Sequence, residues 1–321
     1  MQFTKFGILG NAAKPGAKET VKVLLKLLKE RGVKDCTVIT ELAGLVEEGQ
    51  KLQTSDSPLQ IAETSEVIFS LGGDGTLLTA ARSIMRANSS VELIGVNLGK
   101  LGFIAENAPE LLPEIIDELW ADKLVCEDRL LIRAKVLSES NTSTGTQIRR
   151  DDLDSSREGE RGDNAHLLAL NEIVVDNFGS TRMLTFEIMV QGSVLGKIRA
   201  DGLIIATPTG STGYAASAGG PIVEPTSPVV IITPIASHTL TVRPVIVPQW
   251  YEIDLRITNE GGTPALIVAD GQEEVVVDSP AIVKLSGHSS KLKLLRRSTN
   301  TYFDLLRTKL LWSADAREGR R

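Results

Sequence analysis

The sequence contains little cysteine, no excess of basic residues and no long hydrophobic run. Only Cys36 and Cys126 occur among its 321 residues, and neither lies in a Cys-X-X-Cys pair or a Cys/His cluster. A disulfide framework or a zinc site is therefore not expected, whereas a reducing compartment is. The formal net charge of −6 argues against a nucleic-acid-binding protein, because no basic face would outweigh it.

Signals for secretion or membrane insertion are also missing. The first residues, MQFTKFGILGN, do not show the charged-then-apolar pattern of a secretory signal. No apolar stretch approaches the ~20 residues needed to cross a bilayer. We therefore expect a soluble, cytoplasmic protein without a membrane partner. A composition of 42% hydrophobic and 24% charged residues is typical of globular proteins, and a length of 321 residues suits one large domain or two moderate ones.

In residues 1–125, short apolar runs alternate with amphipathic helical patterns. Residues 3–9 and 67–71 are typical of strands, whereas Val21, Leu24 and Leu28 are spaced to share one helix face. Strands that alternate with helices pair in parallel, with the helices packed on the faces of the sheet. This part of the chain is therefore predicted to be α/β.

Residues 126–300 are predicted to form a second, β-rich domain. Residues 251–257 (YEIDLRI) alternate strictly between apolar and polar, as a half-buried antiparallel strand does. Residues 301–312 have helical spacing again, so we expect residues 301–321 to return to the first domain. Further strands are predicted at 183–190, 229–233, 265–268 and 281–285.

Residues 138–164 (SESNTSTGTQIRRDDLDSSREGERGDN) contain almost no large apolar side chain and are rich in charge, Ser, Thr and Gly. Such a composition cannot bury enough surface to offset the entropy of ordering. We predict a mobile polar insertion on the surface.

The strongest local signal is Gly72-Gly73-Asp74-Gly75-Thr76, which directly follows an apolar strand and directly precedes a helix. Glycines let a backbone approach a phosphate closely, and the positive end of the following helix favours an anion. A carboxylate in such a place repels phosphates unless it accepts a proton or contacts a metal ion. The alternative is a tight turn in which Asp74 only caps the helix. The motif has neither the Gly-Lys-Ser/Thr of a Walker A loop nor the spacing of a dinucleotide GxGxxG.

Two segments of the second domain suit a nucleotide. Residues 207–214 (TPTGSTGY) combine hydroxyls, glycines and one aromatic ring, and could bond ribose and adenine edges with Tyr214 as an apolar wall. A polar turn between strands is the alternative. Glu172 can accept hydrogen bonds from hydroxyls, and Asn171 can both donate and accept. A solvated strand edge is the alternative for that pair.

Taken in order, these motifs resemble the NAD kinase family. Gly72 to Thr76 is shared by NAD kinases and by the diacylglycerol and sphingosine lipid kinases, so it is moderately specific, whereas the TPTGSTGY-containing segment is highly specific. The resemblance runs from the first strand to the terminal LRTKLLW. Its other motifs are NLGKLGF (97–103), ALNE (169–172), DGLIIATPTGSTGY (201–214), AGGP (218–221), RP (243–244) and DGQ (270–272).

The resemblance implies a Rossmann-like N-terminal domain, a β-rich C-terminal domain and a site in the cleft between them. It implies transfer of the ATP γ-phosphoryl group to the 2′-hydroxyl of the adenosine ribose of NAD, with Asp74 as the base. It also implies a homo-oligomer, dimer or tetramer, and a divalent cation, magnesium, held mainly through substrate phosphates; polyphosphate is an open alternative donor. The implied NAD-binding residues are Asp74, Gly75, Asn171, Glu172, Arg182, Arg199, Asp201, Thr212, Gly213, Tyr214, Ala215, Ala216, Ser217 and Gln272, and the phosphate-binding residues are Gly72, Gly73, Gly75 and Thr76.

Two other functions stay open at this point. A lipid kinase would use the same glycine turn but would present an apolar acceptor groove, which the Thr/Ser/Gly-rich residues 207–214 do not favour. A dinucleotide-sensing protein without catalysis is the second, and the intact Asp74 speaks against it.

Overall fold

The computed structural model describes residues 3–46, 52–87, 89–100, 102–138, 147–150, 164–178, 182–259, 262, 264–299 and 301–310. The chain divides into two compact units, one of Met1–Asp128 with Leu292–Arg321 and one of Arg129–Lys291. The division predicted from the sequence, 1–125 with 301–321 against 126–300, assigns residues 292–300 to the second unit. The structure places residues 126–128 and the segment from Leu292 onward in the first unit. Residues 292–296 form a strand of that unit's sheet.

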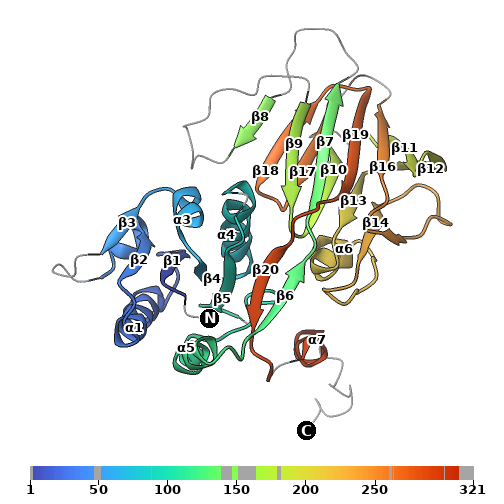
Figure 1. Ribbon diagram of the computed structural model, residues 1–321. Coiled ribbons are helices and arrows are strands. Elements are labelled where there is room, and N and C mark those ends of the chain that lie inside the picture. Colours follow the sequence, from blue (N-terminus) through green and yellow to red (C-terminus); the bar gives the residue numbers. More distant parts are fainter. Residues whose placement is uncertain are drawn as a thin grey trace. The chain divides into compact units, whose positions relative to one another are not determined.

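The first unit is a seven-stranded sheet with helices packed against it (Figure 1). The strand order is β3-β2-β1-β4-β5-β20-β6, and the pairs from β3 to β5 are parallel. Every residue of β4 is buried, as expected for a central strand covered on both faces. Its strands are β1 (Lys5–Gly10), β2 (Asp35–Ile39), β3 (Gln53–Ser55), β4 (Val67–Gly72), β5 (Glu92–Asn97), β6 (Val125–Arg129) and β20 (Leu292–Arg296).

The helices of the first unit follow the apolar periodicity of the sequence. In α1 (Ala17–Glu30) the buried face includes Val21, Leu24 and Leu28, and Gly32 follows the helix at a φ of 80° that favours glycine. The predicted terminal helix is present as α7 (Tyr302–Leu310) and buries Leu305 and Leu306. The remaining helices are α2 (Thr40–Ala43), α3 (Pro58–Thr64), α4 (Asp74–Ala87), η1 (Pro109–Leu111) and α5 (Leu112–Trp120).

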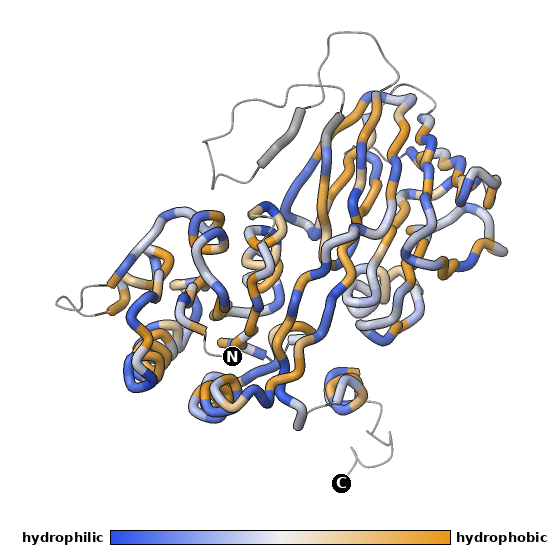
Figure 2. The backbone as a smooth tube through the Cα atoms, viewed as in Figure 1, coloured by the Kyte–Doolittle hydropathy of each residue, from blue (hydrophilic) through white to orange (hydrophobic). Residues whose placement is uncertain are grey.

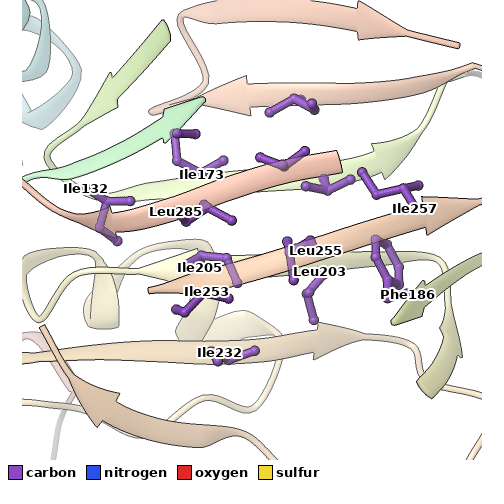
Figure 3. Packing of buried hydrophobic residues seen from close by; sticks show 14 of the residues in the cluster. Ile132, Ile173, Phe186, Leu203, Ile205, Ile232, Ile253, Leu255, Ile257 and Leu285 are labelled. Carbon is purple, nitrogen blue, oxygen red and sulfur yellow. The ribbon is translucent and has the colours of Figure 1, made fainter. Parts of the chain in front are cut away.

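The second unit is built from two antiparallel sheets that enclose one apolar core. One sheet has the order β15-β14-β13-β10-β17-β18-β8 and the other β12-β11-β16-β19-β7-β9. Figure 3 shows side chains from both sheets filling the space between them, among them Phe186, Leu203, Ile232 and Leu255. Burial alternates along β16 as the sequence of that segment predicts, and Figure 2 shows the same alternation of apolar and polar residues along these strands.

The elements of the second unit include two short helical turns after β13, η2 (Thr209–Thr212) and α6 (Tyr214–Ser217). The α/β first unit and β-rich second unit confirm the predicted fold class. The strands are β7 (Ile132–Ser138), β8 (Gln147–Arg150), β9 (Asn164–Ala169), β10 (Glu172–Asn177), β11 (Leu184–Val190), β12 (Ser193–Ala200), β13 (Gly202–Ala206), β14 (Val229–Ile235), β15 (Val245–Pro248), β16 (Ile253–Thr258), β17 (Ala265–Ala269), β18 (Glu273–Val277) and β19 (Ala281–Gly287).

The polar insertion predicted at 138–164 is described in part. Gln147–Arg150 forms β8, which pairs antiparallel with β18, and the two ends of the insertion belong to β7 and β9. Residues 139–146 and 151–163 lie outside the described residues, so the mobility of the insertion stays a prediction. In the part of the chain that the structure describes, no helix is long and apolar enough to span a membrane.

Candidate functional site

The glycine turn lies where β4 ends and α4 begins, at the carboxyl end of a buried parallel strand. Ligands of open α/β sheets bind at this edge. A Cβ on Gly72 would overlap the side chain of Thr76, so packing alone requires glycine there. A Cβ on Gly73 or on Gly75 would meet nothing within 4 Å. The open space beside these two glycines leaves room for a ligand to reach the backbone.

The Asp74 carboxylate accepts three backbone hydrogen bonds from the loop after β5. The N–H of Phe103 donates to Oδ2 at 2.8 Å, while those of Ile104 and Ala105 donate to Oδ1 at 3.1 and 2.9 Å. Gly102 allows this approach, because a Cβ there would overlap Asp74 Oδ1. The carboxylate therefore binds a distant loop, in contrast to the helix cap that was the alternative interpretation.

The geometry distinguishes the two oxygens of Asp74. A carboxylate oxygen has about two lone pairs, so two N–H groups use the capacity of Oδ1, whereas Oδ2 accepts only one of the three bonds. Oδ2 is thus the atom that can accept a further hydrogen from a ligand. Asp74 is half-buried.

The second group of predicted residues begins at the turn between β9 and β10. Thr207 fixes this turn from β13: its Oγ1 donates to the carbonyl of Leu170 at 2.6 Å and its N–H to that of Asn171 at 2.8 Å. The carboxylate of Asp270 accepts the N–H groups of Leu170, Asn171 and Glu172 at 2.8, 2.7 and 3.1 Å. The backbone of the turn is therefore held from two sides.

The side chains of Asn171 and Glu172 carry polar atoms without donors. Asn171 Oδ1 and Glu172 Oε2 are buried and have no hydrogen-bond partner among the described residues. Burial, followed by the nearby charge of Asp270, raises the pKa of Glu172 to about 8. Leaving a buried acceptor unpaired costs about 1–3 kcal/mol. A water or a ligand that brings donors would remove this cost.

Residues 209–217 fold over the same turn. A Cβ on Gly210 would overlap the backbone carbonyl of Asn171, and one on Gly213 would lie 3.1 Å from Glu172 Oε2. The closeness of these segments brings the start of α6 to Glu172. Tyr214, the next residue, is 43% exposed and thus lies outside the core.

The sequence agrees with two family profiles that together span most of the chain. Residues 6–124 match the ATP-NAD kinase N-terminal domain, and residues 170–297 match the ATP-NAD kinase C-terminal domain. The chain belongs to the ATP-NAD kinase family. Its activity is accordingly that of an NAD kinase, a phosphotransferase, which confirms the function predicted from the motifs. Neither profile is that of a lipid kinase.

Curated relatives extend this family assignment over the full length. An NAD kinase of Bacteroides fragilis is 33% identical over 320 residues, covering 98% of this chain and 99% of the relative. An NAD kinase of Pseudomonas entomophila is 33% identical over 313 residues, covering 98% of this chain and 97% of the relative.

Two solved structures share the fold of this NAD kinase family member. Yeast NADH kinase complexed with NADH superposes with a TM-score of 0.84 at 20% identity, covering 98% of this chain and 89% of the yeast chain. An NAD kinase from Archaeoglobus fulgidus in complex with ATP superposes with a TM-score of 0.67 at 24% identity, covering 96% of this chain and 98% of the Archaeoglobus chain.

The remaining residues expected from the NAD kinase family lie on other parts of the second unit. Arg199 is on β12, where it lines a cavity of about 550 Å³ with Lys197 and His238. Arg182 is exposed just before β11, and Asp201 is half-buried between β12 and β13, where its N–H donates to the carbonyl of Ile235. The other expected residues are Thr212 at the end of η2, Ala215, Ala216 and Ser217 in α6, and Gln272 after the β17–β18 turn.

The donor set of the described residues gives no cage for a metal ion. No group of three His, Cys, Asp or Glu side chains comes together in the described ranges. At the glycine turn, the N–H groups of residues 103–105 already occupy most of the Asp74 carboxylate.

Sequence reasoning missed the partners of both carboxylates. Residues 103–105 have apolar side chains, which give no sign of a role at a polar site. They bind Asp74 through their backbone N–H groups. Asp270 was recognised only as part of the DGQ motif, because an Asp-Gly pair is also a common hairpin turn. Its contact with the 170–172 turn joins residues 98 to 100 positions apart.

Proposed function

We propose that this chain transfers the γ-phosphoryl group of ATP to the 2′-hydroxyl of the adenosine ribose of NAD, forming NADP and ADP. The observation that carries the proposal is the open glycine turn around Asp74 in a member of this family. Its relatives agree, since the Archaeoglobus fulgidus structure is described as a complex with ATP and the yeast structure as a complex with NADH.

In the proposed step, the ribose 2′-oxygen forms a bond to the γ-phosphorus as the bond from that phosphorus to the ADP oxygen breaks. The hydroxyl proton goes to Asp74 Oδ2, whose remaining lone pair makes it the available acceptor. Phosphoryl transfer needs alignment, charge neutralisation and deprotonation more than covalent chemistry from the protein. When bound, magnesium would neutralise charge on the transferring group, held mainly through the phosphates.

In this proposal the backbone of the glycine turn binds the phosphates, and the side chain of Thr76 helps to shape the turn. Gly73 and Gly75 have open space beside their α-carbons, so phosphate oxygens can approach the N–H groups at the start of α4. Gly72 and Thr76 pack on each other, so they shape the turn for the phosphates.

The acceptor is recognised through the turn of Asn171 and Glu172. The unpaired oxygens Asn171 Oδ1 and Glu172 Oε2 would accept bonds from the amino and hydroxyl groups of the adenosine part of NAD. Residues 212–217 would line the same ligand, with the ring of Tyr214 as a wall. Arg182 and Arg199 would neutralise the pyrophosphate, and Asp201 and Gln272 would complete the contacts as the family resemblance implies.

We further propose a homo-oligomer, dimer or tetramer, as the family resemblance implies. A cytoplasmic location remains the expectation from composition. The cleft between the two units likewise stays a prediction.

The test is NADP formation by the purified chain with NAD and ATP, with NADH and polyphosphate as alternative acceptor and donor. We expect NADP from NAD and ATP, and none when magnesium is chelated. Binding of NAD without turnover in the presence of ATP and magnesium would contradict the proposal in favour of a dinucleotide-sensing protein.

A further inference from the structure

Asp270 is part of the turn that joins β17 to β18. Asp270 and Gly271 both have positive φ, 51° and 66°, and the N–H of Gln272 donates to the carbonyl of Ala269 at 2.9 Å. An Asp-Gly pair is favoured in such hairpin turns for backbone reasons alone. The turn by itself therefore explains the two residue types without any role in function.

The side chain of Asp270 does more than the turn requires. It accepts the N–H groups of three successive residues, Leu170, Asn171 and Glu172, and its own N–H donates to the carbonyl of Glu172 at 3.0 Å. Asp74 binds residues 103–105 with the same pattern: one N–H on Oδ2 and two on Oδ1. In each unit, one aspartate thus fixes a turn distant in sequence.

The segment that Asp270 holds, residues 170–172, includes two side-chain oxygens without hydrogen-bond partners. Asn171 Oδ1 and Glu172 Oε2 are buried without hydrogen-bond partners among the described residues. Buried acceptors can bind a ligand strongly only if their positions are fixed before it arrives. Among the described contacts, the side chains of Asp270 and Thr207 fix these positions through their hydrogen bonds to the backbone of residues 170–172.

We propose that Asp270 is a positioning residue for dinucleotide binding: it holds the backbone of residues 170–172 so that Asn171 and Glu172 meet the adenosine part of NAD. This inference rests on the proposed function. Asp270 acts through the turn and makes no bond to the substrate.

Asp270→Asn is the variant that separates the hairpin role from the positioning role. Asparagine tolerates positive φ and favours the same turn, so the hairpin is kept. Its amide has only one acceptor oxygen. The NH₂ group would take the place of a carboxylate oxygen that now accepts a backbone N–H, so two donors would face each other there. The matched control is Asp122→Asn, because Asp122 is exposed, has a φ of 55°, and lies in the first unit after α5.

Two readouts are compared between these variants. Amide hydrogen exchange followed over a peptide spanning 168–174 reports the backbone bonds without any ligand. Steady-state kinetics give KM for NAD, KM for ATP and kcat separately. For Asp270→Asn we expect faster exchange in that peptide and a KM for NAD raised about 10- to 100-fold, by analogy with residues that orient the ligands of a metal site. KM for ATP should stay within about twofold, and Asp122→Asn should match the parent in every measurement.

Exchange equal to that of Asp122→Asn, or an unchanged KM for NAD, would overturn the proposal. If Asp270→Asn does not fold, Thr207→Val loosens the turn from the opposite side. It removes the bond from Oγ1 to the carbonyl of Leu170 and also the bond that Oγ1 accepts from the N–H of Gly210, and the same readouts and expectations apply. A parent chain that makes no NADP would refute the proposed function. The exchange measurement would still decide whether Asp270 holds the turn.

Discussion

At the scale of single residues, the glycines of the turn differ in what surrounds them. Gly75→Ala places a methyl group in open space in the first turn of α4, and alanine forms helices more readily than glycine. We predict an unchanged or higher melting temperature together with a raised KM for ATP, because the methyl group obstructs the phosphates. Gly72→Ala is the control, since its overlap with Thr76 should destabilise the fold. An unchanged KM for ATP in Gly75→Ala would place the phosphates elsewhere.

Tyr214 gives a second prediction at this scale. Its ring is 43% exposed, so truncation removes little from the core. By analogy with base stacking, Tyr214→Ala should weaken NAD binding by about 1–3 kcal/mol and leave the melting temperature nearly unchanged. Calorimetry and thermal unfolding on the same preparation measure both. A collapsed melting temperature with unchanged NAD affinity would show that Tyr214 is a structural residue.

The buried carboxyl of Glu172 predicts a pH dependence of stability. Its pKa in the folded protein is raised to about 8 from the ordinary 4.5. Between these values the folded state binds a proton that the unfolded state does not, so stability falls as pH rises through this window and levels off above it. Glu172→Gln should lack this contribution. Melting temperatures of parent and variant, measured without ligand from about pH 5 to pH 9, should therefore diverge; parallel curves would contradict the assignment.

At the scale of elements, the polar insertion adds one short strand to a sheet that is otherwise complete. β18 pairs with β17 on one side and with β8 on the other. We predict that replacing residues 138–164 with a short Gly/Ser linker leaves NAD kinase activity and melting temperature nearly unchanged, because surface loops tolerate length changes at small entropic cost. A second replacement that keeps 147–150 is the control. A loss of activity or of melting temperature that occurs only in the variant without β8 would show that this strand is a functional element.

The sequence predicts elements whose apolar pattern is local. The face of α1 and the alternation of β16 follow from the spacing of side chains over a few residues, and the structure confirms both. β20 was not foreseen as part of the first unit, because its partner β5 is about two hundred residues away and pairing leaves no local mark. The short helical turns η2 and α6 were not predicted either, since a segment rich in Ser, Thr and Gly has no helical periodicity and favours turns.

At the scale of the whole molecule, motif and contact give different information about the site. The motifs led to Asp74, Asn171 and Glu172, whose roles in binding and catalysis stay predictions, whereas the family assignment rests on the match of whole domains. The hydrogen bonds that hold these residues come from backbone groups and from Asp270, whose importance depends on chain folding. The motifs thus name candidate site residues, whereas the hydrogen bonds that orient these residues are seen only in the three-dimensional contacts.

Two variants separate the chemical role of Asp74 from its structural role. Asp74→Asn removes the proton acceptor but also disturbs the bonds to residues 103–105. Asn97→Ala loosens the same loop and keeps the carboxylate, because Asn97 Nδ2 donates to the carbonyls of Lys100 and Ala105 at 2.8 and 3.0 Å. Comparing the two therefore assigns a loss of rate to the carboxylate or to the loop.

The most direct test of the account is the turnover of Asp74→Asn with NAD, ATP and magnesium, measured beside NAD affinity. General-base catalysis is worth about 10²–10⁴-fold, so turnover should fall by that factor and by much less in Asn97→Ala. NAD affinity should change little, because losing a negative charge does not weaken the attraction of phosphates. Turnover of Asp74→Asn within a few-fold of the parent, or an equal loss in Asn97→Ala, would contradict Asp74 as the proton acceptor.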